Sequence, residues 1–500
     1  MYKRQDTTLT INGSGFNSGS TVKLGSTTLN SSLISGTQIT ATVPAASLAS
    51  MGWAGVTVTN LTPGGGTSAS TPLTIFNVIT AGLNNMVYEP FSRKIFASVG
   101  SGSSTLTGNS IAQLTPESGT FNTPANIGSQ PTRLALTSDG KYLYTTLSGA
   151  NSIARFNITS NVADFTFSPA LPTNYYSSTT GFGDVAVQPG SETVLAVNFG
   201  NYNGTGLVDV DVTNRQGTLR GSTNTTTYSS AAAAGTIRFL DASSLFIYDG
   251  SLERYGVPAA GLSYSTTHTG TYLQSFGSFM LSGKYAYSDN GGIANVVGSA
   301  PVQVGIFQQP SATIYTNIQK VAGDSGLNRA FFAAYTGSSS YSYAADGILA
   351  YDQTTLLPTT SLPLGMATIE GTSSYTVNDL IRWGQDGLAL LTSTGHVYLL
   401  RGAAVVPGLL STNSAATLTG ASSTSATHGA DNTLLTLTGT NFLPGVAINW
   451  NGSYRTTTIV DATHVTVAIP SSDLATAGSA TLTAVNPGAS ASAGFTFTIN

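Results

Sequence analysis

The chain has 500 residues, of which 40 % are hydrophobic and only 8 % are charged, and its formal net charge is −4. That length favours two to four domains, and the hydrophobic fraction is sufficient for packed cores. No Lys/Arg-rich run is present, which argues against nucleic-acid binding. No stretch reaches the roughly 18 apolar residues of a membrane helix, so we expect no membrane insertion. The lack of cysteine excludes disulfides, thiolate zinc sites and a cysteine nucleophile.

The polar residues are mainly Ser, Thr, Asn and Gly instead of Lys and Glu. Because Thr, Tyr, Val and Ile favour strands, the composition predicts an all-β protein. Such a composition is common among bacterial exported proteins, and we expect an extracellular or cell-surface location. Residues Met1–Gln5 run straight into a predicted strand. We therefore expect the first domain to be N-terminally truncated, with an export signal or anchor in the missing region.

The first predicted element, an alternating strand near residue 9, belongs to a motif that recurs at the other end of the chain. The motif is a glycine, a phenylalanine three positions later and a second glycine after three more, at Gly13/Phe16/Gly19 and at Gly439/Phe442/Gly445. The offset of 426 between the copies is constant from Gly13 to Gly52. The phenylalanine is suited to plug the end of a sandwich, and the second glycine permits a turn with positive φ.

This motif resembles the IPT/TIG family of immunoglobulin-like domains. The resemblance implies a β-sandwich over residues 1–76 and another over residues 411–500, acting as spacers, adhesive modules or oligomer contacts. The second copy has a lead-in, residues 416–427, that we expect to form its first strand and turn. The first copy has no such lead-in, in keeping with the expected truncation.

Residues 77–410, between these two ends, contain a second repeat. A turn residue followed by an apolar/polar alternation recurs at 109–114, 151–156, 206–211, 250–255, 291–296, 346–351 and 394–399. A hydrophobic strand that ends in a turn lies about 20 residues before each copy. Units of 40 to 60 residues are typical of four-stranded propeller blades. The sequence therefore predicts a seven-bladed β-propeller, because closure into a ring removes long free edges.

The most regular unit, from Pro131 to Phe156, resembles the YVTN and lactonase-like propeller repeat. Some lactonase-like relatives are hydrolases or lyases that use residues around the channel. No catalytic motif of that family aligns with this chain, so no catalytic residue is carried over. The predicted architecture is thus all-β, with a seven-bladed propeller between two immunoglobulin-like sandwiches.

The residue directly before each predicted inner strand is polar. These positions gather near one mouth of a propeller channel, and here they are Asn85, Arg133, Asp184, Thr236, Ser278, Asn317 and Asp379. One interpretation is a binding site for a small molecule, an ion or a glycan. The other, which we favour, is that strand starts beside a wet channel are polar in any case.

Other chemistry-bearing residues form no recognisable site. The histidines lack metal-ligand spacing, so we expect neither a metal nor a cofactor; they are His268, His396, His428 and His464. Residues 323–326 read Gly-Asp-Ser-Gly, but a serine nucleophile needs a histidine and an acid, and this segment falls where other units have a turn. Four tyrosines in Ser-rich segments suit contact with carbohydrate or protein, or pad the loops; they are Tyr175, Tyr176, Tyr341 and Tyr343.

Three functions remain open on the sequence. The leading hypothesis is a non-enzymatic extracellular scaffold or adhesin that binds a glycan or protein ligand through propeller loops. The second is an exported lactonase-like hydrolase or lyase that works at the channel mouth. The third is a structural subunit of a surface layer or filament, with self-association through the terminal domains.

Overall fold

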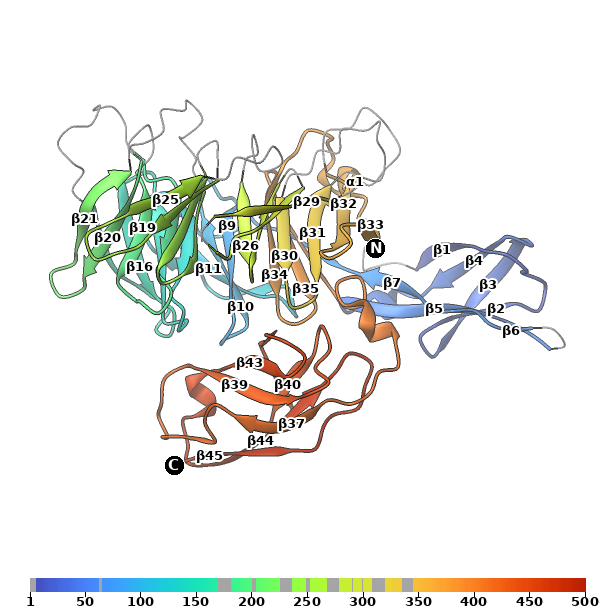
Figure 1. The fold of residues 1–500 in the computed structure, drawn as a ribbon. Coiled ribbons are helices and arrows are strands. Elements are labelled where there is room, and N and C mark those ends of the chain that lie inside the picture. The colour runs from blue at the N-terminus through green and yellow to red at the C-terminus, as the bar shows by residue number, and fades with distance from the viewer. Residues whose placement is uncertain are drawn as a thin grey trace.

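The computed structural model describes residues 6–62, 65–169, 181–199, 204–224, 236–248, 252–267, 278–289, 291–298, 300–307, 320–334 and 345–500. Over these residues the chain forms a sandwich domain, a ring of sheets and a second sandwich domain (Figure 1). The predicted all-β class and the order of its parts are confirmed.

The N-terminal domain consists of antiparallel strands and one short 3-10 helix. They are β1 (Thr7–Asn12), β2 (Thr21–Leu24), β3 (Thr27–Ser35), β4 (Gln38–Val43), η1 (Ala45–Leu48), β5 (Gly52–Asn60), β6 (Gly66–Thr67) and β7 (Thr71–Ile75). Among the described residues the strand order is β1-β4-β3-β2-β5-β6, and β7 also pairs with β5. The alternate residues that face inward, such as Val22, Ile39 and Val43, form its core.

The first glycine of the repeated motif is required by close approach to the phenylalanine. A Cβ atom on Gly13 would lie 2.6 Å from the Phe16 ring, and one on Gly439 would lie 2.5 Å from the Phe442 ring. Real Cβ atoms do not approach a ring this closely, so only glycine leaves the ring in place.

The second glycine of the motif differs between the copies. Gly445 adopts φ +89°, as predicted. Gly19 lies outside the left-handed region, so the predicted positive φ is wrong in that copy. Its turn is closed by a side chain instead, because the Asn17 Oδ1 accepts the N–H of Gly19 at 2.9 Å.

Seven sheets follow one another in the described part of the chain, and we number them as blades 1 to 7. Blade 1 has β9 (Leu83–Glu89), β10 (Lys94–Val99), β11 (Ser110–Thr115), β12 (Thr120–Phe121) and β13 (Ala125–Asn126). Blade 2 has β14 (Pro131–Leu136), β15 (Tyr142–Leu147), β16 (Ser152–Asn157) and β17 (Val162–Phe167). Blade 3 has β18 (Val185–Val187), β19 (Val194–Asn198), β20 (Thr205–Asp211) and β21 (Gln216–Asn224).

The remaining blades repeat this arrangement. Blade 4 has β22 (Thr236–Asp241), β23 (Ser244–Tyr248), β24 (Leu252–Gly256) and β25 (Ser263–Thr267). Blade 5 has β26 (Phe279–Ser282), β27 (Tyr285–Ser288), β28 (Gly292–Asn295) and β29 (Val302–Ile306). Blade 6 has β30 (Lys320–Asp324), β31 (Arg329–Ala334), β32 (Gly347–Asp352) and β33 (Pro358–Pro363), and is followed by α1 (Met366–Glu370).

Blade 7 closes the ring with a strand from elsewhere in the chain. It has β34 (Val377–Trp383), β35 (Gly387–Thr392) and β36 (His396–Arg401), and its outer strand is β8 (Asn77–Thr80). β8 precedes blade 1 in the chain and pairs antiparallel with β36, from Asn77 opposite Leu399 to Thr80 opposite His396. The inner strands contact one another in chain order, and β34 contacts β9, so the ring is complete.

The seven predicted alternations form the third strand of each blade. Several have a residue with positive φ at or next to their start: Asn109 (φ 59°), Asn151 (φ 47°), Gly291 (φ 89°) and Gly395 (φ 89°). Asparagine and glycine tolerate this left-handed conformation better than other residues. In these four units the turn residue thus has a backbone reason.

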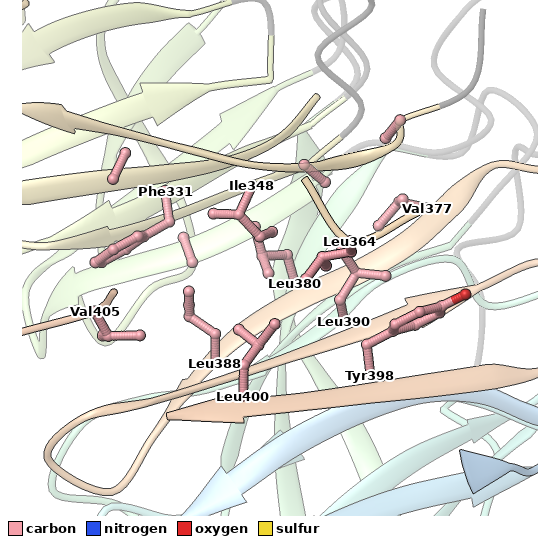
Figure 2. Packing of buried hydrophobic residues seen from close by; sticks show 14 of the residues in the cluster. Phe331, Ile348, Leu364, Val377, Leu380, Leu388, Leu390, Tyr398, Leu400 and Val405 are labelled. Atoms are coloured by element: carbon pink, nitrogen blue, oxygen red, sulfur yellow. The ribbon is translucent and has the colours of Figure 1, made fainter. Parts of the chain in front are cut away.

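Neighbouring blades are held together by apolar side chains that fill the space between their faces. The largest such cluster joins blades 6 and 7 (Figure 2). Phe331 and Ile348 from blade 6 meet Leu380, Leu388 and Leu390 from blade 7, all of them buried.

The C-terminal domain follows η4 (Pro407–Leu410) and is a sandwich of two sheets. One sheet contains β37 (Thr417–Ala421), β39 (Thr433–Thr440), β43 (His464–Ile469) and β42 (Thr457–Ile459). The other contains β38 (Ser425–Ala426), β45 (Phe495–Ile499), β44 (Gly478–Val485), β40 (Ala447–Trp450) and β41 (Ser453–Arg455), and η5 (Ser471–Asp473) precedes β44. The lead-in thus forms strands, as predicted.

This C-terminal sandwich packs under the propeller, on the face where the inner strands end (Figure 1). Gln385, just after β34, donates to the carbonyl of Val446 at 2.5 Å and accepts from the Tyr454 hydroxyl at 3.0 Å. The Thr456 hydroxyl donates to the carbonyl of Pro90 at 2.7 Å, next to β9. One face of the propeller is therefore occupied by the protein itself.

Ring closure through β8 can be tested at Val78, which packs against the core of blades 6 and 7. We expect Val78→Asp to destabilise the protein by about 2 kcal/mol or more, because it places a charge against an apolar cluster. Urea unfolding followed by circular dichroism measures the change. Thr80→Asp is the control, since Thr80 lies on the same strand and is exposed. Equal effects of the two substitutions would contradict the role given to β8.

Candidate functional site

The polar residues predicted at the channel mouth lie at the starts of the inner strands, on the face opposite the C-terminal sandwich. In each blade we take a residue at or near the start of the inner strand that directly precedes a buried residue. The structure places Asn85, Arg133, Asp184, Thr236, Ser278 and Asp379 there. Asn317 lies outside the described residues, and the corresponding position of β30 is Lys320, directly before the buried Val321.

Asp379 joins the last blade to the first. Its Oδ2 accepts the backbone N–H of Met86 at 2.9 Å and the side-chain amide of Asn85 at 2.8 Å. Met86 is a buried residue of the inner strand of blade 1. The carboxylate therefore binds a backbone donor on the neighbouring blade at the place where the ring closes.

The same contact recurs at other blades. The Oδ1 of Asn85 accepts the N–H of Leu134, in blade 2, at 3.0 Å. The Oδ2 of Asp184 accepts the N–H of Ile237, in blade 4, at 3.0 Å. In each case a carbonyl-type oxygen accepts from the backbone of the next inner strand. These three side chains act as hydrogen-bonded links between blades, because an unpaired buried N–H would cost about 1–3 kcal/mol.

Further charged groups lie beside these linking residues at the mouth. Asp184 is also paired with Arg238, whose Nη1 lies 2.7 Å from Oδ2. Across the mouth, the Lys320 ammonium donates to the Ser278 hydroxyl at 3.1 Å, and this hydroxyl lies 3.1 Å from the Oδ2 of Asp289. Three cations and three carboxyls thus meet at one mouth when Arg133 and Asp379 are included.

Burial shifts the pKa values of two of these groups, Asp379 and Lys320. It raises the pKa of the Asp379 carboxyl above its ordinary value, and the Met86 N–H and nearby cations, of which Arg133 is the first, oppose this shift only in part. Burial also lowers the pKa of Lys320, against the opposing attraction of Asp289 and Asp379. The mouth is therefore a partly desolvated place in which added charge interacts strongly.

Arg133 and Thr236 differ from the linking residues. Arg133 is exposed at the mouth, whereas Thr236 is buried. The mouth thus has a long cationic side chain, Arg133, that is open to solvent beside the linking residues. This arrangement can bind carboxylate or hydroxyl oxygens of a ligand without any change to the inner strands.

The sequence analysis missed Lys320, Arg238 and Asp289. Lys320 could have been found as the cation directly before the buried pair Val321 and Ala322. Arg238 lies two residues after the predicted position in its blade, so only the register between blades 3 and 4 reveals its contact with Asp184.

The remaining predicted features are dispersed. His396 contacts the buried Glu370 at 2.9 Å, and His464 lies 3.1 Å from Asp461. No group of three or more His, Cys, Asp or Glu that could hold a metal occurs among the described residues. Asp324 ends β30, and Ser325 and Gly326 form the turn to β31, which confirms the turn predicted at residues 323–326. His268 and the four loop tyrosines, 175, 176, 341 and 343, lie outside the described residues.

Two clefts, of about 540 and about 420 Å³, lie on the opposite face, between the propeller and the C-terminal sandwich. Arg93 lines both, and its guanidinium donates to the carbonyl of Tyr454 at 3.1 Å. Gln385 and Tyr454, which join the two domains, line the smaller one. We therefore assign these clefts to the joint between domains.

Sequence comparison supports the two ends of the architecture. The sequence profile of the IPT/TIG domain matches residues 2–75 and 416–499. A search of curated protein sequences gives no match to this chain. No helix of the described residues is long and apolar enough to cross a membrane.

Structural comparison supports the fold. A fungal alcohol oxidase of the AA5 family, in complex with copper, aligns with a TM-score of 0.52 at 11% identity over 85% of this chain and 99% of its own. The β-propeller domain of Cps50 (Swd1) from Myceliophteria thermophila aligns with a TM-score of 0.46 at 10% identity, over 65% of this chain and 97% of its own. The WD40 repeats of RRP9 give 0.46 at 13% identity, over 65% and 97%. At 11% identity the alignment with the alcohol oxidase shows a similar fold alone. IPT/TIG domains at both ends of a propeller indicate a scaffold or binding role.

The link formed by Asp379 leads to a pH-dependent prediction. Asp379→Ala should destabilise the protein by about 1–3 kcal/mol, because the Met86 N–H loses its acceptor. Asp379→Asn keeps an acceptor oxygen and removes the buried charge. Since the folded-state pKa of Asp379 is raised, the wild type gains stability as pH falls through that pKa, and the Asn variant does not.

Urea unfolding at several pH values between about 4 and 7 measures both effects. We expect Asp379→Asn to be at least as stable as the wild type at neutral pH and to lose that advantage on acidification. An Asn variant that is as unstable as the Ala variant at every pH would show that the carboxylate is required as a charge.

Proposed function

We propose that this protein is a non-enzymatic extracellular or cell-surface scaffold of an exported bacterial type, which binds a glycan or protein ligand on the propeller face that carries Arg133. The observation that carries the proposal is the contrast between the two faces. One face is covered by the C-terminal sandwich through Gln385, Tyr454 and Thr456. The other presents the exposed Arg133 beside partly buried charges.

The roles of the carboxyls support binding over catalysis. A general acid or base needs a carboxyl that is available to a substrate. Asp379 accepts from the backbone and side chain of blade 1. Asp184 accepts from the backbone of blade 4 and is paired with Arg238. Both are thus used to hold the ring together.

The terminal IPT/TIG domains fit a scaffold in which the propeller is presented at a distance from its attachment. β7 of the first domain is separated from β8 of the propeller by a single residue, Phe76, whose ring lies 6.2 Å from that of Tyr398 in blade 7. A connection this short restricts the movement of the first domain. Adhesion at a cell surface would make use of such a fixed spacing.

A glycan array probed with the full chain and its Arg133→Ala variant tests the proposal. We expect binding to a subset of glycans that falls about tenfold or more in Arg133→Ala, since charge-assisted hydrogen bonds are lost. Arg215→Ala is the matched control, because Arg215 is exposed in the β20–β21 turn, away from the mouth. If no glycan binds, a protein ligand can be sought with the same pair of variants.

Two results would contradict the proposal. Binding that falls equally in both variants would contradict a site at the mouth. Turnover of a lactone by the purified chain, abolished in Asp184→Ala while the variant remains folded by circular dichroism, would favour an enzyme instead.

A further inference from the structure

The charged residues at the mouth of the channel alternate in sign around the propeller. The cations belong to blades 2, 4 and 6, and the carboxyls belong to blades 3, 5 and 7. In chain order they are Arg133, Asp184, Arg238, Asp289, Lys320 and Asp379. Because the inner strands contact one another in chain order, the three cations surround one opening from three sides.

The carboxyls of this set are held by donors of the protein itself. Asp379 and Asp184 each accept a backbone N–H of a neighbouring inner strand, at 2.9 and 3.0 Å. Asp289 is buried, and its Oδ2 accepts the Ser278 hydroxyl at 3.1 Å. At least one oxygen of each carboxyl is therefore already engaged within the propeller.

The cations are more open to solvent than the carboxyls. In the ion pair between blades 3 and 4, the side chain of Arg238 is 41% exposed and that of Asp184 is 10% exposed. Arg133 is exposed, and Lys320 is half-buried and donates to the Ser278 hydroxyl. Neither Arg133 nor Lys320 forms an ion-pair contact with another residue of the described chain. A ligand that approaches the opening thus meets positive charge first.

The three cations are close enough to act on the same groups. Burial is the largest cause of the raised pKa of Asp379, and all three cations oppose it. Burial is also the largest cause of the lowered pKa of Lys320, and Arg133 and Arg238 add to it. Asp289 and Asp379 act on Lys320 in the opposite direction. The cations therefore repel one another at a partly desolvated mouth, and a bound anion would relieve this repulsion.

We propose that the mouth binds the carboxylate of an acidic sugar residue, a uronic acid, between Arg133, Arg238 and Lys320. This proposal rests on the function proposed above, since it names the class of glycan taken by the same site. A guanidinium binds a carboxylate through two parallel N–H···O bonds, and an ammonium adds a compact charge. A pyranose ring carries its carboxylate and hydroxyls on one compact frame, which suits donors that surround a single opening.

Calorimetry with the full 500-residue chain tests the proposal. The probes are short oligomers of galacturonate and of glucuronate, each as the free acid and as its methyl ester. Esterification removes the charge and keeps the rings and hydroxyls. We expect at least one free acid to bind, and its ester to bind about tenfold more weakly or less, because charge-assisted hydrogen bonds are lost. Raising NaCl from about 0.05 M to about 0.5 M should weaken the acid and leave the ester unchanged.

Lys320→Gln is the sharpest variant, because glutamine keeps an N–H donor for the Ser278 hydroxyl and removes the charge. We expect the free acid to bind this variant about fivefold more weakly or less, with little change for the ester. Arg133→Gln, at an exposed position, should act in the same direction without any burial to disturb. Arg215→Gln is the matched control, since it changes the net charge equally in the exposed β20–β21 turn. Circular dichroism checks that each variant is folded.

The outcomes separate this proposal from the function on which it rests. Equal binding of acid and ester, weakened alike by Arg133→Gln, would overturn the acidic sugar and leave glycan binding at the mouth in place. Binding of neutral glycans without binding of either uronate would do the same. Absence of any glycan binding would overturn both. A triglutamate peptide that binds more tightly than the uronates, with the same loss in Lys320→Gln, would replace the sugar by an acidic protein.

Discussion

The pairing of β8 with β36 is the contact on which the rest of the structure depends. It is the sole place in the described chain where residues from before the first blade complete the last one. The apolar core between blades 6 and 7 includes Val78 from this strand, so ring closure is supported by packing as well as by hydrogen bonds. Blade 7 thereby becomes the junction from which both terminal domains leave the propeller.

The polar residues at the mouth of the channel, on the opposite face, meet a related requirement of the closed propeller. An inner strand at the channel has one edge without a neighbouring strand, and the buried N–H groups on that edge must find other acceptors. Asp379, Asn85 and Asp184 meet this need between blades 7 and 1, 1 and 2, and 3 and 4. Residues at the mouth that do not accept such a hydrogen bond, Arg133 above all, can take part in binding without weakening the contacts between blades.

Periodicity predicted the fold well because strand patterns and turn residues are local properties. The alternation from Ser152 to Phe156 is readable alone, and the turn before it has a local cause in the left-handed Asn151. The contents of the candidate site were less predictable because they depend on register between blades. Blade 6 shows this: Lys320 of β30 lies beside Ser278 of blade 5, and nothing local in the sequence around Lys320 indicates that contact. Arg238 was missed for a related reason, since its partner Asp184 is 54 positions away in sequence.

The short connection between the first sandwich and the propeller also determines how tension would act on the molecule. β8 begins at Asn77 and is antiparallel to β36, which ends at Arg401, so the chain enters one strand and leaves the other at the same end of the pair. Pulling the two terminal domains apart loads the Asn77–Leu399 pair first and the His396–Thr80 pair last, one after another instead of together. The contacts of Gln385 and Thr456 under the propeller shield this pair until they break. The contacts between the C-terminal sandwich and the propeller therefore oppose the separation of β8 from β36. They would have to break before blade 7 could open.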